Sequence, residues 1–249
     1  MPAVSDGALA GRKILITGGS TGLGAALAGL CTQAGAAVGI VARSAERLAE
    51  VADATGAVAV PVDISDFDAA TAAVEEIAGR LGGIDTLVNN AGVMLHSPVG
   101  AGFAEDWQRI FDINVIGTLH VTRAALPYLR AAPRGDLLMV ASTSADKVTA
   151  PDYGVYAATK AAQARLVDGL RLELADAPHV RVVLVKPGFM NTPGLGPGTR
   201  NPELQQNVVA LKEKIGLPPV RVAEQLLHVL AVPPEVTITE LTIMPTAKA

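Results

Sequence analysis

The sequence contains one cysteine, Cys31, among 249 residues. A single cysteine excludes a disulfide framework within the chain and a metal cluster built from cysteines. No apolar run reaches the roughly 20 residues that a membrane span needs, and residues 1–11 lack the basic and apolar segments of a signal peptide. We therefore expect a protein of the reducing cytoplasm that has no membrane segment and binds no metal.

Clusters of positive charge are also missing. The chain carries 20 basic and 24 acidic residues, for a formal net charge of -4. No Lys/Arg run and no basic aromatic stripe is present, so we expect no nucleic-acid partner. Half of the residues are hydrophobic and 18% are charged, which predicts a sizeable core. Because no linker or change in composition divides the chain, we predict one domain over residues 1–249.

Short apolar runs alternate with helical patterns along the whole chain. Strands are predicted at 13–17, 37–42, 57–62, 85–89, 137–141, 180–185 and 237–244. The first helix is predicted to start in the glycine turn that follows residue 17 and to end at residue 34. Further helices are predicted at 44–54, 66–81, 104–131, 153–175, 203–215 and 220–230, with a break near Gly117. This alternation predicts an α/β fold in which helices cover both faces of a parallel sheet. Right-handed crossovers make such a sheet doubly wound.

Three glycines follow the first strand, at Gly18, Gly22 and Gly24. They lie in a strand–turn–helix–strand unit, where glycines let the backbone approach a pyrophosphate and a helix N-terminus faces the anion. The spacing T-G-x-x-x-G-x-G differs from the G-x-G-x-x-G fingerprint. Tight packing alone also explains such glycines, but their position favours phosphate binding.

Tyr156 and Lys160 stand four residues apart at the start of a long helical pattern. Residues i and i+4 lie on one helix face, so the phenol and the ammonium share a small volume. A free tyrosine, with a pKa of roughly 10, is a poor acid–base catalyst near neutrality. A cation about 4 Å away, at an effective dielectric of about 20, is worth about 4 kcal/mol. We therefore expect Lys160 to lower the pKa of Tyr156.

Several ordered motifs together resemble the short-chain dehydrogenase/reductase family, in its short single-domain branch. They are Thr17-Gly18-x-x-x-Gly22-x-Gly24, Asp63-Ile64, Asn89-Asn90-Ala91-Gly92, Asn114, the hydroxyl cluster Ser142-Thr143-Ser144, Tyr156-x-x-x-Lys160, Pro187-Gly188 and Thr192. The resemblance covers essentially the whole chain. It implies a Rossmann-like seven-stranded parallel sheet in the order 3-2-1-4-5-6-7, and hydride transfer between NAD(P) and an alcohol or carbonyl.

The resemblance also implies catalytic roles. Tyr156 would be the general acid in carbonyl reduction and the base in alcohol oxidation, and Lys160 would bind the nicotinamide ribose. Asn114 would hold a water that links Lys160 to solvent as a proton relay, unless it only bends or caps a helix. The catalytic hydroxyl is Ser142 if the strand from Gly135 sets the count, or Thr143 if the usual spacing to the tyrosine does. We prefer Ser142, because the loop can absorb an extra residue.

Further residues are expected to bind the cofactor by the same resemblance. Asp63 would accept from the adenine amino group with Ile64 beside the ring, although Asp63 also suits a simple strand-end turn. Pro187 and Gly188 would shape the turn beside the nicotinamide, and Thr192 would bond its carboxamide. The remaining predicted cofactor residues lie in loops that follow two strands: Gly18, Ser20, Thr21, Gly22, Leu23 and Gly24, then Asn90, Ala91 and Gly92.

The end of the second strand predicts the choice of cofactor. An acidic residue there would bond the ribose hydroxyls of NAD and repel a 2′-phosphate. This chain has Ala42 at that position, followed by Arg43, whose guanidinium can fork onto a phosphate. Ser44 adds a hydroxyl or serves only as the N-cap of the next helix. We predict a preference for NADP(H) over NAD(H).

The substrate cleft is expected outside the carboxyl ends of the strands. Its predicted wall residues are Met94, His96, Ser144, Tyr153, Phe189 and Met190. His96 is otherwise a solvated loop histidine, and Tyr153 a surface residue, since Ala157 rather than a lysine follows it by four. The Gly- and Pro-rich segment 189–215 suits a lid. A small or medium carbonyl or alcohol fits this largely apolar pocket.

Two other functions compete with a reductase. One is a cofactor-binding regulatory protein without turnover, against which the intact Tyr156, Lys160, Asn114 and hydroxyl cluster argue. The other is a sugar-nucleotide epimerase or dehydratase, against which the glycine spacing and the missing C-terminal substrate domain argue. By the family resemblance, we also expect a homodimer or homotetramer formed through the helices at 117–131 and 153–175.

Overall fold

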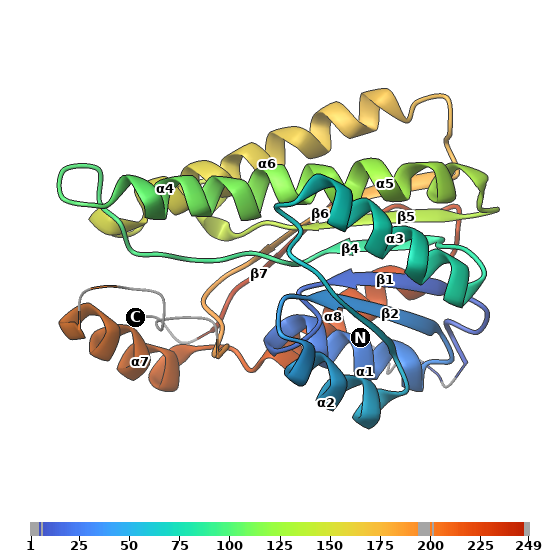
Figure 1. The fold of residues 1–249 in the computed structure, drawn as a ribbon, viewed down its shortest axis with the longest axis horizontal. Coiled ribbons are helices and arrows are strands. Elements are labelled where there is room, and N and C mark those ends of the chain that lie inside the picture. Colours follow the sequence, from blue (N-terminus) through green and yellow to red (C-terminus); the bar gives the residue numbers. More distant parts are fainter. Residues whose placement is uncertain (1–4, 6, 194–199, 201, 247–249) are drawn as a thin grey trace.

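A computed structural model describes residues 5, 7–193, 200 and 202–246 (Figure 1). Within them the strands are β1 (Lys13–Thr17), β2 (Ala37–Ala42), β3 (Val58–Pro61), β4 (Thr86–Asn89), β5 (Gly135–Val140), β6 (Val180–Pro187) and β7 (Glu240–Ile243). The α-helices are α1 (Gly22–Gln33), α2 (Ala45–Thr55), α3 (Phe67–Leu81), α4 (Ala104–Phe111), α5 (Thr118–Ala131), α6 (Gly154–Glu173), α7 (Pro202–Ile215) and α8 (Pro219–Ala231). Three short turns are η1 (Asp112–Gly117, π-helical), η2 (Thr143–Ala145) and η3 (Pro151–Tyr153), the last two being 3-10.

The strands form one sheet in the order β3-β2-β1-β4-β5-β6-β7, and every neighbouring pair is parallel. This confirms the predicted Rossmann-like fold and strand order. Because all strands run the same way, their carboxyl ends meet at one edge. The order reverses direction between β1 and β4, which is the switch point where such sheets bind ligands.

Each face of the sheet has its own core, because side chains alternate along a strand. In β1, Leu15 joins a cluster that includes α3, α5 and α6, whereas Ile14 and Ile16 join the cluster of α1, α2 and α8. Figure 1 shows these two groups of helices on opposite sides of the sheet. Burial on both faces explains why the strands read as continuous apolar runs.

The predicted helix break near Gly117 is a widened turn. The π-helical turn η1 joins α4 to α5 without ending the helix. A Cβ at Gly117 would lie 2.7 Å from Cγ1 of Ile64, so glycine allows the close approach of this turn to the loop after β3. Single π turns inside helices are frequent at functional sites, and this one contains Asn114.

The last strand is shorter than predicted, since β7 begins at Glu240 rather than 237. The β-branched run before it favours a strand. However, side chains bond its carbonyls: the Arg181 guanidinium donates to Val236 O at 2.6 Å, and that of Arg171 donates to Thr239 O. Leu184 N of β6 also donates to Thr239 O at 3.0 Å, and the paired register with β6 begins at Glu240.

Two expected absences can be examined in the described part of the chain. No helix there is long and apolar enough to cross a membrane. No group of three or more His, Cys, Asp or Glu residues among the same residues is arranged to hold a metal ion.

Candidate active site

The glycine turn between β1 and α1 forms a tight cradle at the switch point. Gly18 and Gly22 have φ of 69° and 57°, in the left-handed region that favours glycine. A Cβ on Gly24 would lie 2.3 Å from Gly18 O. Within the described residues, the Thr21 side chain makes no capping bond to α1, so first-turn N–H groups remain for an anion. These features fit the pyrophosphate of a dinucleotide.

Hydrogen bonds fasten this cradle to the loop after β4. The side-chain amide of Asn90 donates to Thr17 O at 2.9 Å and to Gly18 O at 3.3 Å. The Thr17 hydroxyl accepts from the backbone N–H groups of Asn90 and Ala91 at 3.0 and 2.9 Å. The Asn90 side chain thus shapes the cradle, and the predicted Ala91 and Gly92 follow it along the same loop.

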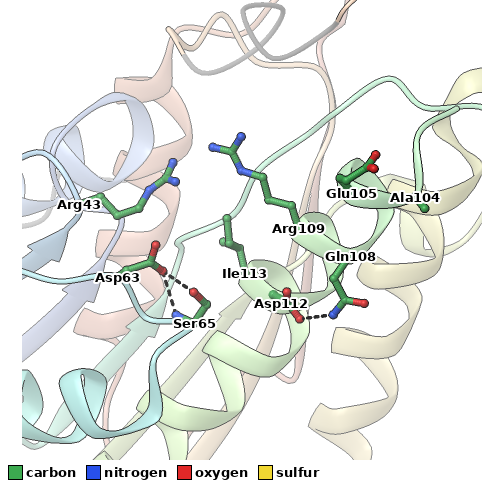
Figure 2. A pocket seen from close by; sticks show the side chains of 9 residues that line it. All are labelled: Arg43, Asp63, Ser65, Ala104, Glu105, Gln108, Arg109, Asp112 and Ile113. Atoms are coloured by element: carbon green, nitrogen blue, oxygen red, sulfur yellow. Dashed lines mark hydrogen bonds between the residues drawn. The ribbon is translucent and has the colours of Figure 1, made fainter.

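A pocket of about 530 Å³ lies beside the cradle, at the ends of β2 and β3. Arg43 and Arg109 reach toward the same opening from opposite sides, and Asp63 lies below them (Figure 2). Burial pushes the pKa of Asp63 up, but hydrogen bonds from Ser65 and the charges of Arg43 and Arg109 outweigh it and lower the pKa. An ionised acceptor and two cations fit an adenosine carrying a phosphate.

At this end the sequence analysis missed one residue, and two of the predicted residues have structural contacts of their own. The sequence analysis did not predict Arg109 as a cofactor residue. The only feature that could have indicated it is its position in a helical pattern, five residues before Asn114. The Ser44 hydroxyl accepts from Arg47 N at 3.3 Å and so caps α2, which is the plainer of its two predicted roles. Ile64 is 6% exposed and belongs to the core cluster beneath α3, α5 and α6, rather than projecting from the pocket.

Tyr156 lies in the first turn of α6, where it meets the end of β5. Burial raises the pKa of its phenol to about 12, and a hydrogen bond from the Ser142 hydroxyl opposes that rise. Ser142 directly follows Ala141 at the end of β5, as the count along the strand predicts, whereas Thr143 begins the turn η2. The structure therefore brings Ser142 to Tyr156.

Lys160 is buried one helical turn after Tyr156, with 4% exposure. Its Nζ donates to Val140 O at 3.1 Å and to Gln163 Oε1 at 2.8 Å. Burial lowers the pKa of Lys160 to about 7. The expectation that Lys160 lowers the pKa of Tyr156 is therefore wrong for the protein alone. Its Nζ lies 5.8 Å from the Tyr156 ring centroid, and the phenol's own burial dominates.

Asn114 is fully buried in η1 and joins three segments. Its side-chain amide bonds both Val93 O and Val93 N, at 2.9 and 2.8 Å, and also Thr159 Oγ1 at 3.1 Å. Its backbone carbonyl accepts from Gln163 Nε2 at 2.7 Å. Gln163 was missed by the sequence analysis. The available signal was its position three residues after Lys160, on the same helix face.

The loop after β6 closes the other side of the cradle. Gly188 N donates to Ile243 O at 2.7 Å, which fixes the Pro187-Gly188 turn against β7. A Cβ on Gly22 would lie 3.3 Å from Thr192 Cγ2, so Thr192 lies over the start of α1. This position suits the predicted contact of Thr192 with the nicotinamide. Residues 194–199 and 201 of the predicted lid lie outside the described residues.

The predicted substrate residues divide into two groups. Met94, Ser144, Tyr153 and Phe189 are partly exposed. The His96 side chain is fully enclosed: its Nδ1 bonds Asp152 Oδ2 at 2.6 Å, and its ring packs edge-on against Tyr153. His96 thus ties the loop after β4 to η3, and its ring does not face open space as predicted. Met190 packs against the core beside α1 and α8.

Comparisons with known proteins agree with this geometry. The family described as short chain dehydrogenase matches residues 12–202. An uncharacterized oxidoreductase of Staphylococcus saprophyticus is 34% identical over 240 residues, which cover 94% of this chain and 97% of the relative. A short chain dehydrogenase of Burkholderia cenocepacia, solved in complex with NADP, has a TM-score of 0.81 and 29% identity, covering 95% of this chain and 97% of that one.

A second solved structure gives the same result. An alcohol dehydrogenase from the archaeon Thermococcus sibiricus, complexed with 5-hydroxy-NADP, has a TM-score of 0.82 and 25% identity. The similarity covers 96% of this chain and 98% of that one. The likeness therefore extends over the glycine cradle, the pocket of Arg43 and the Tyr156 region alike.

Proposed function

Because this chain belongs to the short chain dehydrogenase family, we propose that it moves a hydride between NADP(H) and a small or medium carbonyl or alcohol. The observation that carries this proposal is the Tyr156–Ser142 hydroxyl pair beside buried Lys160, at the sheet edge that holds the glycine cradle. Two of the similar solved structures contain NADP or a derivative, which supports the choice of cofactor.

The residues of the chain divide the chemistry between them. Bound NADPH would supply the hydride. Tyr156, whose pKa of about 12 keeps the phenol protonated at neutral pH, would donate its proton to the substrate oxygen. The Ser142 hydroxyl would donate a hydrogen bond to the same oxygen as negative charge develops there. Lys160 would orient the nicotinamide ribose through the N–H that its bonds to Val140 and Gln163 leave over.

The preference for NADP(H) rests on two arginines. In this proposal Arg43 and Arg109 bind the 2′-phosphate from both sides of their shared pocket, and Ala42 supplies no carboxylate to repel it. A charge-assisted bond is worth about 1.5–3 kcal/mol, so Arg43→Asp should lower kcat/KM for NADP at least about tenfold relative to NAD. Arg109→Gln should lower it in the same direction by less. Arg165→Gln, on the surface of α6, is the matched control. Equal or better use of NAD by the wild type would overturn the preference.

Reduction of carbonyls is tested by following NADPH oxidation against a panel of ketones and aldehydes. Tyr156→Phe should lower kcat by about 10²- to 10⁴-fold, the usual contribution of a general acid, while the Kd for NADPH stays unchanged. Ser142→Ala should lower kcat by about 10²-fold or more, and Thr143→Ala should not. If NADPH binds but no carbonyl or alcohol gives Tyr156-dependent turnover, the protein is a cofactor-binding regulator instead.

The wider setting follows the sequence expectations. We propose a homo-oligomer, because Leu119 on α5 and Leu172 on α6 are 37% and 80% exposed, and light scattering after gel filtration would measure it. We also propose one domain over 1–249, and a cytoplasmic location that suits a chain with a single cysteine.

The segment 189–215 would cover the cleft. In support, Arg200 bonds both carboxylate oxygens of Asp106 on α4, at 3.0 and 2.9 Å.

A further inference from the structure

We infer that Gln163 is a positioning residue for Lys160, and that its side-chain amide joins Lys160 to Asn114, where the sequence analysis expected a water held by Asn114. The inference rests on the proposed function, in which Lys160 must hold a positive charge beside Tyr156 and the cofactor. It changes the expected proton path, since an amide bridge replaces a water bridge.

The bridge consists of short bonds between fully enclosed groups. Lys160 Nζ donates to Gln163 Oε1 at 2.8 Å, and Gln163 Nε2 donates to Asn114 O at 2.7 Å. Gln163 and Asn114 are both 0% exposed. The orientation of the amide follows from its partners, because an ammonium can only donate and a carbonyl can only accept. Gln163 therefore connects α6 to the π turn with its oxygen toward Lys160.

The Asn114 carbonyl has no capacity left for a bridging water. It accepts from Gln163 Nε2 and also from the Thr118 hydroxyl at 2.9 Å. A backbone carbonyl has two lone pairs, and these two donors use both. A water relay through Asn114, which the sequence predicted, therefore cannot use this carbonyl. The wide turn at Asn114 instead supplies a fixed anchor for the glutamine.

An amide bridge holds the lysine but does not conduct protons as a water does. The amide nitrogen keeps its two protons, and the amide oxygen has none to give. Lys160 has three N–H groups, of which Val140 O and Gln163 Oε1 take two. The third is left for the cofactor ribose. Tyr156, which is partly exposed, must then recover its proton from the side of the substrate cleft.

Only neutral groups surround the lysine. The titratable group near it is the phenol of Tyr156 on its own helix; the groups from η1, α5 and β5 are the amide of Asn114, the hydroxyl of Thr118 and the carbonyl of Val140. No carboxylate in the described part of the chain forms an ion pair with Lys160, and burial alone shifts its pKa. The oxygens of Gln163 and Val140 thus carry the stabilisation of the ammonium against burial.

Two substitutions of Gln163 should move the charge of Lys160 in opposite directions. Gln163→Leu keeps the approximate volume but removes the acceptor, so the Lys160 titration midpoint should fall by about 1 pH unit or more. Gln163→Glu offers a carboxylate to the ammonium, so the midpoint should rise by at least as much. Gln163→Met is a second apolar variant in case Gln163→Leu does not fold. Val167→Ala, a buried cavity variant one turn further along α6, should leave the midpoint unchanged.

The measurement is an NMR titration of lysine side chains, isotopically labelled, in the cofactor-free protein. Lys160→Arg identifies the signal by its loss. Opposite shifts for Leu and Glu support the inference, while equal shifts or none overturn it, because a merely structural role would not reverse with charge. The alkaline limb of the kcat–pH profile should follow the same order. If the midpoints move as expected but no carbonyl is reduced, the proposed function fails and the positioning role stands.

Discussion

Buried and partly buried cations lie at opposite ends of the same strand, β5. At its first residues, Asp136 is fully buried and accepts from Arg12 at 2.6 Å and from Arg181 at 2.5 Å. Arg134 lies 3.4 Å from the same carboxylate. At its last residue, the Val140 carbonyl accepts from Lys160, which forms no ion pair with any described carboxylate. One strand thus carries arginines that pair with carboxylates at one end and a lysine without such a partner among the described residues at the other.

The difference separates the arginines, which stabilise the structure, from the lysine that we propose acts in catalysis. Charges removed from water are tolerated when carboxylates and hydrogen bonds compensate them, and Asp136 and Asp85 do this for the arginines. Lys160 lacks such a partner, so burial appears directly as a pKa lowered to about 7. A carboxylate would stabilise the ammonium but cancel its field at Tyr156 and the cofactor. Perturbed, unpaired groups of this kind mark functional sites.

Position at the carboxyl edge does not decide this by itself. Lys186 in β6 is also buried at that edge, yet its Nζ lies 2.8 Å from Asp146 and 2.5 Å from Glu240. These carboxylates raise the pKa of Lys186. Lys186 therefore resembles the arginine cluster at the other end and ties the loop after β5 to β6 and β7. Carboxylate partners, rather than position in the sheet, distinguish Lys186 from Lys160.

The largest expected effect comes from removing the shared counter-charge. Asp136→Asn keeps the shape of the side chain but leaves Arg12, Arg134 and Arg181 with less negative charge. Removing one partner of a buried ion pair costs about 3–5 kcal/mol, so the free energy of unfolding in urea should fall by about that amount. Asp85→Asn, whose side chain is 15% exposed, should cost less. A loss below about 1 kcal/mol, as for a surface pair, would contradict the structural role.

Lys160→Met should have the opposite effect on stability. Replacing Lys160 by an apolar side chain leaves no buried carboxylate without its ion partner. The free energy of unfolding should therefore stay unchanged or rise by about 1–4 kcal/mol at pH 7 or below. The same variant should lose about 10²-fold or more in kcat, since the ribose and Tyr156 lose their cation. Urea denaturation and NADPH oxidation measure the two effects. A large loss of stability would place Lys160 with the structural cations.

The pH dependence of stability sharpens the same contrast. Folded Lys160, with a pKa of about 7, holds fewer protons than the unfolded chain at pH values up to its ordinary value near 10.5. Stability should therefore rise with pH above about 7, by up to about 1.4 kcal/mol per unit. Above about pH 10 the raised pKa of Tyr156 reverses the trend, because the unfolded tyrosine loses its proton first. The difference between wild type and Lys160→Met from pH 7 to 9.5 isolates the slope. If this difference in the free energy of unfolding does not change with pH, the pKa of Lys160 is not lowered in the folded protein.

Much of the fold was predictable because it depends on local pattern. The bounds of β1 and β2 match the predicted ranges, since buried parallel strands are continuous apolar runs between glycines and caps. The start of β7 at Glu240 was not predictable, because the β-branched run before it has the local pattern of a strand although its carbonyls bond arginines of α6 and β6. The sequence indicated a break near Gly117, but not the π turn that keeps the helix continuous.

The site residues that could be predicted are those at fixed spacings in the sequence. Tyr156 and Lys160 are four residues apart, and Ser142 follows the last residue of a strand by two positions. Gln163 and Arg109 were not found, because a helical pattern alone does not indicate that the Gln163 side chain bonds a buried lysine or that the Arg109 side chain lines a pocket. The pKa of Tyr156 was predicted in the wrong direction, since burial depends on tertiary packing that spacing does not describe.

The smallest expected effect belongs to an exposed ion pair, which sets the scale for the buried ones. Arg130 on α5 bonds both oxygens of Asp176 at 2.9 and 3.0 Å, with side chains 39% and 73% exposed. Solvent screens such a pair, so Asp176→Asn should lower the free energy of unfolding by only about 0.2–1 kcal/mol. Raising the salt concentration should remove most of that difference, whereas it should change the effect of Asp136→Asn little. An Asp176→Asn loss as large as that of Asp136→Asn would mean that geometry, rather than burial, governs the ion pairs of this protein.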